Sequence, residues 1–215
     1  MAKKVPIAVV RRLPRYFRYI SELYRQNKMK ISSKELSERM QVTASQIRQD
    51  FNHFGGFGQQ GYGYNVPTLN NEMSQILGVN ENFSAIIVGI GNLGHAIANN
   101  VNFTKRGVRI LGLFDSDSEK IGKPCGVHVI ADVASLPEFC KKSLPDIAIL
   151  TLPKNAAPDM FEKLKELGVR GFWNFSNTEI HSDPDVAVEN VHIGDSLMLL
   201  TYRLREMAEE EVTEE

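Results

Sequence analysis

The stretch Phe83-Ser84-Ala85-Ile86-Ile87-Val88-Gly89-Ile90-Gly91-Asn92-Leu93-Gly94 decides the fold of the larger part of this 215-residue chain. Its first half is a continuous apolar run, which is typical of a strand buried on both faces of a parallel sheet. Its second half has the spacing Gly-x-Gly-x-x-Gly, and a helical pattern from His95 to Val101 follows. The glycine motif alone is weak evidence, but between a strand and a helix it predicts a dinucleotide site.

The glycine turn supplies most of the predicted ligand contacts. Gly89 permits the tight turn, Gly91 lets the backbone reach the pyrophosphate, and Gly94 lets the helix pack closely on the strand. The start of the helix adds free N–H groups and the positive end of its dipole. A glycine-rich turn that serves packing only is the alternative. The predicted contacts are Gly89, Ile90, Gly91, Asn92, Leu93 and Gly94.

An acidic residue stands where a dinucleotide site needs one. The predicted strand Val108–Phe114 ends at Asp115, about 20 residues beyond Gly94. A carboxylate there accepts hydrogen bonds from the ribose hydroxyls of adenosine, and it repels a 2′-phosphate. The sequence Asp115-Ser116-Asp117 holds no arginine for that phosphate, so NADH and NAD+ are favoured as ligands over their phosphorylated forms.

Strands and helices alternate through the rest of this region, which predicts an α/β Rossmann domain with a doubly wound parallel sheet. The expected strands cover 127–130, 146–151, 171–175 and 186–191, and the expected helices cover 135–142 and 156–167. Ligands of such sheets lie at the carboxyl ends of the strands. A ligand contact and an ordinary loop role are equally good interpretations of the residues there, which are Thr151, Leu152, Pro153, Lys154 and Asn174.

The N-terminal part of the chain is basic, and helices are expected in it. Residues 1–60 hold 12 Lys and Arg against 4 Asp and Glu, although the whole chain has a net charge of −1. This asymmetry indicates that only this part meets a polyanion, and a solvated basic surface is the alternative. The first predicted helix covers 7–26, and the next two begin at the capping residues Ser32 and Thr43. The tight turn 41–43 joins the last two into a helix-turn-helix unit.

The helix from Thr43 is therefore the predicted DNA-reading helix of a winged-helix domain. Its buried face holds Ile47, Phe51 and Phe54, and Gly55 ends it. Its polar face carries residue types that bond to base edges, with arginine for guanine and glutamine or asparagine for adenine. An ordinary solvated face is the alternative. The predicted contacts from this helix are Thr43, Ser45, Gln46, Arg48, Gln49 and Asn52.

The glycine- and aromatic-rich stretch 55–64 predicts a small β-hairpin, or wing, whose backbone comes close to DNA phosphates. A short helix over 69–77, capped by Thr68, follows it. Basic side chains add affinity and salt dependence through phosphate contacts. The predicted contacts of these two kinds are Gly58, Gln60 and Gly61 in the wing, and Arg11, Arg12, Arg15 and Lys34 outside it.

The chain ends in a predicted helix over 195–207, capped by Asp195, with an acidic continuation. Its apolar stripe (Leu197, Leu200, Leu204 and Met207) packs either on its own domain or on a partner subunit, and symmetric DNA readers usually dimerise. The expected domains are therefore 1–79 for DNA binding, 80–192 for NAD(H), and 193–215 for a dimerisation helix and acidic tail.

Several classes of protein are disfavoured. No apolar run approaches the ~18 residues of a membrane span, and the N-terminus lacks the apolar core of a signal peptide. The two cysteines, Cys125 and Cys140, suit a reduced cytoplasm, and no Cys/His cluster has metal-ligand spacing. We expect a cytoplasmic protein without membrane or metal.

The main alternative function is a small NAD-dependent oxidoreductase with an accessory basic domain. Such an enzyme needs a substrate pocket and a proton donor near the nicotinamide. The Rossmann region is too short for a separate substrate domain, and the histidines are scattered (His53, His95, His128, His181 and His192), so we predict no catalysis. A third interpretation is an NAD-binding adaptor whose basic domain contacts protein or RNA.

These motifs together resemble those of the Rex family of bacterial redox-sensing repressors, over nearly the whole chain. The resemblance rests on Val5-Pro6, 12–16 with Arg18, the helix-turn-helix segment 41–50, Phe54-Gly55, Gly61-Tyr62-Gly63-Tyr64, 88–94, Phe114-Asp115, Thr151-Leu152-Pro153 and Asn174-Phe175. The combination of this helix-turn-helix with this Rossmann start is far more specific than either part alone.

The resemblance implies a homodimer that binds a palindromic operator in double-stranded DNA when NAD+ dominates and is released by NADH. It also implies control of fermentative and respiratory genes, and a C-terminal helix exchanged between subunits. Two features depart from the family. Gln59 and Gln60 stand where the wing is often basic, which lowers the expected phosphate affinity. Asn100 stands where some members have a tyrosine near the nicotinamide, which bears on how NADH is told from NAD+.

Overall fold

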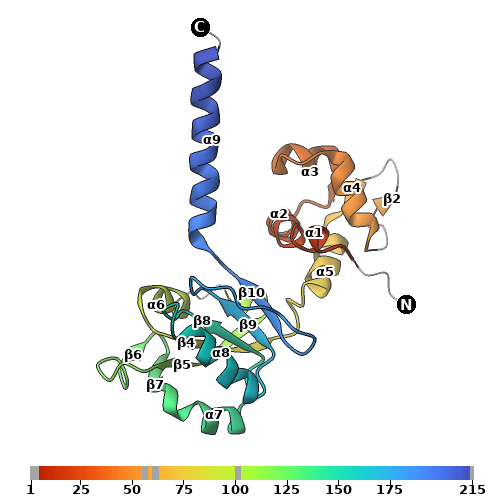
Figure 1. Cartoon of the computed structure of the whole chain (residues 1–215). Coiled ribbons are helices and arrows are strands. Elements are labelled where there is room, and N and C mark those ends of the chain that lie inside the picture. Colours follow the sequence, from red (N-terminus) through yellow and green to blue (C-terminus); the bar gives the residue numbers. More distant parts are fainter. Residues whose placement is uncertain (1–4, 55–57, 60–62, 100–102, 214–215) are drawn as a thin grey trace. The chain divides into compact units, whose positions relative to one another are not determined.

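A computed structural model describes residues 5–54, 58–59, 63–99 and 103–213 of the chain (Figure 1). The chain divides into two compact units, Met1–Glu81 and Asn82–Glu215, and each is considered by itself. Among the described residues, no helix is both long and apolar enough to span a membrane. No group of His, Cys, Asp and Glu in the same residues could hold a metal ion.

The first unit combines helices with a small antiparallel sheet, as expected for a winged helix. The strand order is β1-β3-β2. The outer strand β1 was missed by sequence reasoning, since two residues carry no periodic pattern. The elements are α1 (Ile7–Val10), α2 (Leu13–Arg25), β1 (Lys30–Ile31), α3 (Ser33–Met40), α4 (Ala44–Asn52), β2 (Gly58–Gln59), β3 (Gly63–Asn65) and α5 (Val66–Ile76).

The single helix predicted over 7–26 is wrong, because the chain forms α1 and α2 with a turn between them. Pro14 lies at the start of α2. In a continuous helix its ring would clash with the carbonyl of Val10, and its missing N–H would leave that carbonyl unpaired. At the start of a helix neither cost arises. The proline therefore separates the two helices.

The core of the first unit lies between α2 and the helix-turn-helix. Tyr16 of α2 is fully buried, whereas Tyr24 on the same helix is about half exposed. The ring of Phe51 packs in a T-shaped arrangement against Tyr16 and against Tyr64, with centroid distances of 5.1 Å in both pairs. Other fully buried members are Leu13, Ile20, Leu23, Leu36, Met40 and Ile47. Phe54 lies beyond the end of α4 and is only partly buried.

Side-chain caps define where the helices begin. Ser32 accepts a hydrogen bond from the Glu35 N–H (3.0 Å), and Thr43 accepts one from the Gln46 N–H (3.1 Å), so both predicted caps are confirmed. The cap predicted at Thr68 is wrong. Asn65 caps α5 instead, by accepting from the Thr68 N–H at 2.9 Å. Helix α5 therefore begins at Val66, three residues before the predicted start, with Pro67 in its first turn, where proline is well tolerated.

The second unit is the predicted Rossmann domain. Its seven-stranded sheet has the order β10-β9-β8-β4-β5-β7-β6, and every pair is parallel except β6 with β7. The strands are β4 (Phe83–Val88), β5 (Val108–Asp115), β6 (Pro124–Cys125), β7 (His128–Asp132), β8 (Ile147–Leu150), β9 (Gly171–Asn174) and β10 (Ala187–Asn190). Strand β6 was not predicted.

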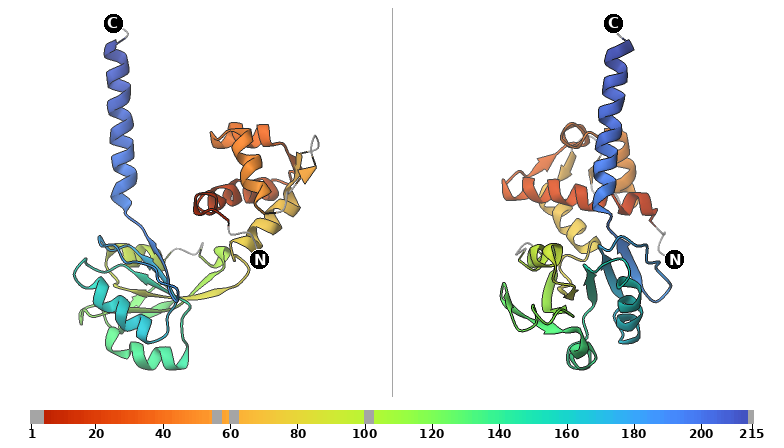
Figure 2. Two further views of the ribbon diagram at one scale, coloured as in Figure 1. Left: turned by 45° about the vertical axis from the view of Figure 1, so that its right-hand side comes forward. Right: turned by 60° about the vertical axis from the view of Figure 1, so that its left-hand side comes forward.

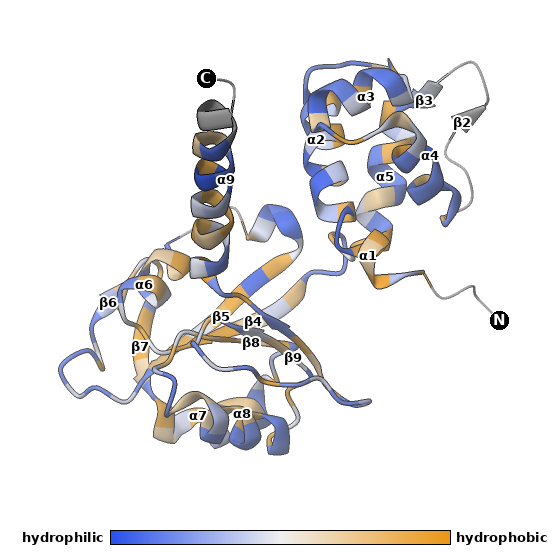
Figure 3. Ribbon diagram, turned by 45° about the horizontal axis from the view of Figure 1, so that its top comes forward, coloured by the Kyte–Doolittle hydropathy of each residue, from blue (hydrophilic) through white to orange (hydrophobic). Residues whose placement is uncertain are grey.

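Helices cover both faces of this sheet. Figure 3 shows α6 on one face and α7 and α8 on the other. Two separate apolar clusters match this layering, one that includes Ile97 of α6 and one that includes Leu136 of α7 and Leu164 of α8. The helices are α6 (Asn92–Ala98), α7 (Leu136–Lys142) and α8 (Ala157–Glu166), with short 3-10 turns at Thr104–Arg106 and Val133–Ser135.

The last helix, α9, covers Ile193–Thr213 and appears in dark blue in Figure 2. It begins before Asp195 and continues past Met207, so the predicted bounds were too short and Asp195 lies in the first turn instead of at the cap. Every residue from 193 to 209 is exposed, including the whole apolar stripe. The stripe therefore does not pack on its own domain.

The cap of α5 can be tested by a pair of substitutions. We expect Asn65→Ala to lower the free energy of unfolding of the first unit by about 1 kcal/mol, because the Thr68 N–H loses its acceptor. Thr68→Ala serves as the matched control and should change it by less than about 0.5 kcal/mol. Urea unfolding followed by circular dichroism measures both. Equal losses for the two variants would contradict the assignment of the cap.

Candidate functional site

The glycine turn follows β4 and uses its first and third glycines for backbone packing. Gly89 has a φ of +94°, and a Cβ there would lie 2.7 Å from the carbonyl oxygen of Thr151. A Cβ on Gly94 would collide with the carbonyl oxygen of Gly89 and lie 2.8 Å from Thr151 Oγ1. Both positions therefore need glycine for the fold itself, with or without a ligand.

Gly91 has a different role. Its φ of −83° is open to any residue, and a Cβ built there meets nothing within 4 Å. Helix α6 begins directly after it, at Asn92, which is earlier than predicted. Helix geometry leaves the first N–H groups of α6 without partners inside the helix. A bare backbone beside open space, with N–H groups next to it, fits a bound pyrophosphate.

The carboxylate of Asp115 lies at the carboxyl end of β5 and is 6% exposed. Its Oδ2 accepts from the Ile90 N–H at 2.6 Å, and its Oδ1 accepts from the Asp117 N–H at 2.9 Å. Burial alone would raise the pKa of Asp115, but these hydrogen bonds and the ammonium of Lys120 outweigh it, so the pKa lies below its usual value. The structure thus joins the predicted ribose-side acid directly to the glycine turn.

Lys120 was missed by sequence reasoning. Its Nζ lies 3.2 Å from Asp115 Oδ2 and 3.4 Å from Asp117 Oδ2. A lysine a few positions beyond the acid, in the same loop, was the available signal. It was overlooked because only an arginine was sought for a 2′-phosphate.

The loop after β8 borders the glycine turn. Thr151 Oγ1 donates to the carbonyl oxygen of Gly89 at 2.5 Å, and a Cβ on Gly89 would lie 2.9 Å from the Leu152 side chain. The hydroxyl of Thr151 therefore braces the turn. Pro153 and Lys154 are exposed beyond it. The predicted neighbourhood of 151–152 with the turn is thus present in the structure.

Asn174 lies at the carboxyl end of β9, as predicted, and its side chain makes four hydrogen bonds within the protein. Its Nδ2 donates to the Thr178 carbonyl and to Asn190 Oδ1, both at 2.8 Å. Its Oδ1 accepts from the Ser176 N–H at 3.0 Å and from Ser176 Oγ at 2.6 Å. All four hydrogen-bonding positions of the amide are used, and the side chain is 0% exposed. The amide of Asn174 therefore shapes the loop, and the predicted contact of this residue with a dinucleotide stays a prediction.

The recognition helix α4 presents a polar outer face. Thr43 is exposed at its cap, and Ser45, Arg48, Gln49 and Asn52 are exposed along it. Arg48 Nη1 donates to Ser33 Oγ of α3 at 3.0 Å, which orients the guanidinium along that face. Gln46 differs, because its Nε2 donates to Asp50 Oδ1 at 2.8 Å. Its side chain therefore belongs to an internal network.

Asp50 is the centre of that network and is 1% exposed. Arg12 binds both of its oxygens, through Nε and Nη2, each at 2.7 Å, and the Tyr16 hydroxyl donates to Oδ2 at 2.7 Å. Burial opposes ionisation, but the donors from Arg12, Tyr16 and Gln46 outweigh it and lower the pKa of Asp50. Burial and the neighbouring carboxylate raise the pKa of Tyr16. These bonds tie α2 to the recognition helix.

Two predicted phosphate contacts therefore have internal roles that sequence reasoning missed. Arg12 is paired with Asp50, and Arg15 Nη2 donates to the Met40 carbonyl at the end of α3. Both lie in the first unit, but neither is a simple surface cation. Arg11 and Lys34 are exposed. Of the wing residues, Gly58 and Gln59 form β2, which pairs with β3, while Gln60 and Gly61 lie outside the described residues, as does Asn100.

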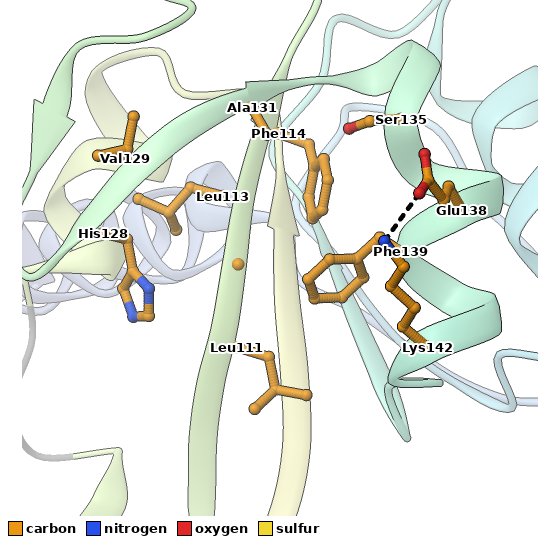
Figure 4. A pocket seen from close by; sticks show the side chains of 11 residues that line it. Leu111, Leu113, Phe114, His128, Val129, Ala131, Ser135, Glu138, Phe139 and Lys142 are labelled. Atoms are coloured by element: carbon orange, nitrogen blue, oxygen red, sulfur yellow. Dashed lines mark hydrogen bonds and ion pairs between the residues drawn. The ribbon is translucent and has the colours of Figure 1, made fainter.

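A cavity of about 330 Å³ lies away from the glycine turn, lined by residues of β5, β7 and α7. Figure 4 shows apolar walls from Leu113, Phe114 and Phe139, with His128 and an exposed Glu138–Lys142 ion pair beside them. No residue of the glycine turn lines it. Its walls and position do not match a dinucleotide, so the candidate site is the turn and not this cavity.

Two family models match the chain. The model described as "Putative DNA-binding protein N-terminus" matches residues 4–52, and the model described as "CoA binding domain" matches residues 80–178. The first covers the helix-turn-helix, and the second covers the glycine turn, Asp115 and the loop after β8.

Curated relatives match over nearly the full length. The redox-sensing transcriptional repressor Rex of Caldicellulosiruptor saccharolyticus is 52% identical over 95% of this chain and 93% of its own. That of Clostridioides difficile strain 630 is 45% identical over 95% and 97%. A solved structure of RSP, in complex with NAD+ and operator DNA, is 45% identical with a TM-score of 0.89 over 99% of both chains. Another, of RSP with NADH, is 42% identical with a TM-score of 0.89 over 98% and 99%.

The Asp50 network predicts a pH-dependent stability. At pH 7 we expect Asp50→Asn to lower the free energy of unfolding of the first unit by about 2–3 kcal/mol, because the buried carboxylate loses the charge that pairs with the partly exposed Arg12. The pKa of Asp50 is lower in the folded protein than in the unfolded chain, where it is about 3.9. The stability that the charged carboxylate contributes is therefore complete above the unfolded-state pKa, and it is lost as the pH falls through the folded-state pKa. The difference between wild type and variant should therefore shrink below about pH 4.

Urea unfolding from pH 7 to pH 3 measures this difference. Glu38→Gln, which removes an exposed acid of α3, is the matched control and should have little effect at pH 7. A difference for Asp50→Asn that stays constant over this range would show that the carboxylate charge contributes nothing.

Proposed function

The chain belongs to the Rex family of redox-sensing transcriptional repressors, and we propose that it represses genes by binding an operator that NADH makes it release. We assign DNA binding to residues 1–79, dinucleotide binding to 80–192 and dimerisation to 193–215. The observation that carries the proposal is the open backbone at Gly91, joined through the Ile90–Asp115 hydrogen bond to a ribose-side carboxylate. It lies in one chain with an exposed, arginine-bearing recognition helix.

In this proposal NAD+ and NADH are signals and are not consumed. The pyrophosphate is held by the N–H groups at the start of α6, since those of Gly89 and Ile90 already have partners in the protein. Asp115 accepts from the adenosine ribose. Leu152, Pro153 and Lys154 line the same side from the loop after β8, while Thr151 braces the turn. A bound dinucleotide supplies a nicotinamide whose charge changes on reduction. The relatives are named as repressors, so the oxidoreductase considered from the sequence is set aside.

For DNA, α4 is the element that enters the major groove. Arg48, Gln49 and Asn52 are exposed on one helix and have the donors and acceptors that base edges require. Thr43 and Ser45 extend the same surface toward the start of the helix, where phosphates are favoured. The further backbone contacts that we propose come from Arg11 and Lys34, from unused N–H groups of Arg12 and Arg15, and from Gly58, Gln60 and Gly61 of the wing.

A second copy of the chain is the proposed partner of α9. Eight apolar residues of this helix are between 52% and 63% exposed. Helical spacing places the stripe and Ile193 on one side, and Met198, Leu199 and Tyr202 on other sides. A helix that is apolar on several sides is normally buried. A homodimer supplies that cover, and its symmetry matches a palindromic operator with two half-sites. We expect this dimer to act in the cytoplasm, where both DNA and the dinucleotide pool are found.

Release by NADH has a thermodynamic requirement. A ligand shifts DNA binding only by its difference in affinity between the DNA-binding and the released arrangement of the dimer. NADH must therefore bind the released arrangement more tightly than the DNA-binding one. NAD+ must bind the two arrangements more equally, or must prefer the DNA-binding one. The link is reciprocal, so operator DNA must weaken NADH binding by the same factor.

The central experiment is fluorescence anisotropy of labelled operator DNA with added dinucleotide. We expect micromolar NADH to raise the apparent Kd for the operator at least tenfold, and NAD+ to leave it unchanged or lower it. Gly91→Val should bind the operator normally and lose the NADH response, because its side chain fills only the open space before the turn. A melting temperature equal to that of the wild type confirms that the variant is folded. An operator affinity insensitive to NADH in the wild type refutes the proposal.

Base reading by α4 is tested by comparing Arg48→Ala with Lys34→Ala on operator and random DNA. Loss of the Arg48 guanidinium should weaken operator binding by about 1–3 kcal/mol and random DNA much less, since a bidentate base contact is lost. Lys34→Ala should weaken both DNAs equally and reduce the salt dependence, as a phosphate contact does. Equal losses on both DNAs for Arg48→Ala would assign this residue to the phosphates.

A further inference from the structure

The loop after β5 holds three charged side chains at the place where an adenosine ribose would lie. The Lys120 ammonium contacts Oδ2 of both Asp115 and Asp117, at 3.2 and 3.4 Å. The side chains of Lys120 and Asp117 are about 40% exposed, so both face the solvent from which a ligand arrives. The charge that a ligand meets here is therefore set by two carboxylates and one ammonium.

The orientation of the two carboxylates does not depend on the lysine. Asp115 is held by the N–H groups of Ile90 and Asp117, and Asp117 Oδ1 accepts from the Glu119 N–H at 2.9 Å. These three bonds come from the backbone. Removing the lysine side chain should therefore change the local charge while leaving the shape of the loop in place.

We propose that Lys120 is a specificity-determining residue that sets how strongly this site excludes a 2′-phosphorylated dinucleotide. The inference rests on the proposed binding of NADH. An aspartate after β5 repels a 2′-phosphate, and Asp117 adds a second negative charge. The ammonium of Lys120 cancels one of the two charges and can donate a hydrogen bond to the phosphate. The site therefore tolerates NADPH better than its two carboxylates alone would allow.

The lysine adds a feature that the sequence analysis did not consider. The absence of arginine in 115–117 favoured NADH over NADPH, and a cation is supplied here from five residues beyond Asp115. Lys123, three residues further on, is exposed, and among the described residues it makes no ion pair with either carboxylate. It provides a control of equal charge in the same loop.

The test compares NADH and NADPH, which differ only in the 2′-phosphate, by calorimetric titration of the full-length protein. At low salt, Lys120→Met should weaken NADPH binding about tenfold and NADH binding less than threefold. The control Lys123→Met should change neither of the two affinities. Asp117→Asn removes a negative charge, so it should strengthen NADPH binding and reduce the difference in affinity between NADH and NADPH. Because the effect is electrostatic and partly exposed, the extra loss for NADPH in Lys120→Met should shrink at 0.5 M NaCl.

The outcomes separate this inference from the proposed function. A wild type that binds neither dinucleotide refutes the proposed function and the inference together. A wild type that binds NADH, with Lys120→Met weakening both ligands by the same factor at every salt concentration, overturns the inference alone, since the lysine would then only support the loop. A fall in the thermal midpoint of Lys120→Met without a change in the NADH/NADPH ratio overturns it in the same way.

Discussion

A carboxylate that leaves water needs a full set of hydrogen-bond donors, and this requirement organises both units of the chain. In the first unit, Asp50 collects Arg12, Tyr16 and Gln46, and so fixes the recognition helix against α2. In the second, Asp115 draws the Ile90 N–H toward the end of β5 and holds the glycine turn in its open shape. In each case a surface meant for a ligand is supported from behind by a buried charge.

Features that depend on near neighbours could be predicted from the sequence. The glycine turn, the caps at Ser32 and Thr43, and the acid at Asp115 each act within one strand-turn-helix or one helical turn, and all are present. Features that depend on distant partners could not. Arg12 meets an acid 38 residues away, and no local pattern distinguishes it from a surface cation. The ends of the strands could be located from the sequence, but the partners of the side chains there could not. The amide of Asn174, for example, makes all of its hydrogen bonds within the protein.

The three glycines of the turn show that one motif can combine two separate demands. Gly89 and Gly94 are required by backbone contacts that exist without a ligand, whereas Gly91 has an ordinary φ and open space before it. A similar division exists on α4, where Phe51 and Ile47 are buried and the exposed positions take no part in the core. Fold and recognition are therefore encoded at alternate positions of the same short segments.

The exposure of α9 also has a consequence for how stability depends on concentration. The apolar side chains of this helix are exposed over the described part of the chain. In the proposed dimer a second copy covers them, so the free energy of association adds to the stability of each folded chain. The melting temperature of such a dimer rises with protein concentration, and dilution weakens the assembly before it unfolds the subunits.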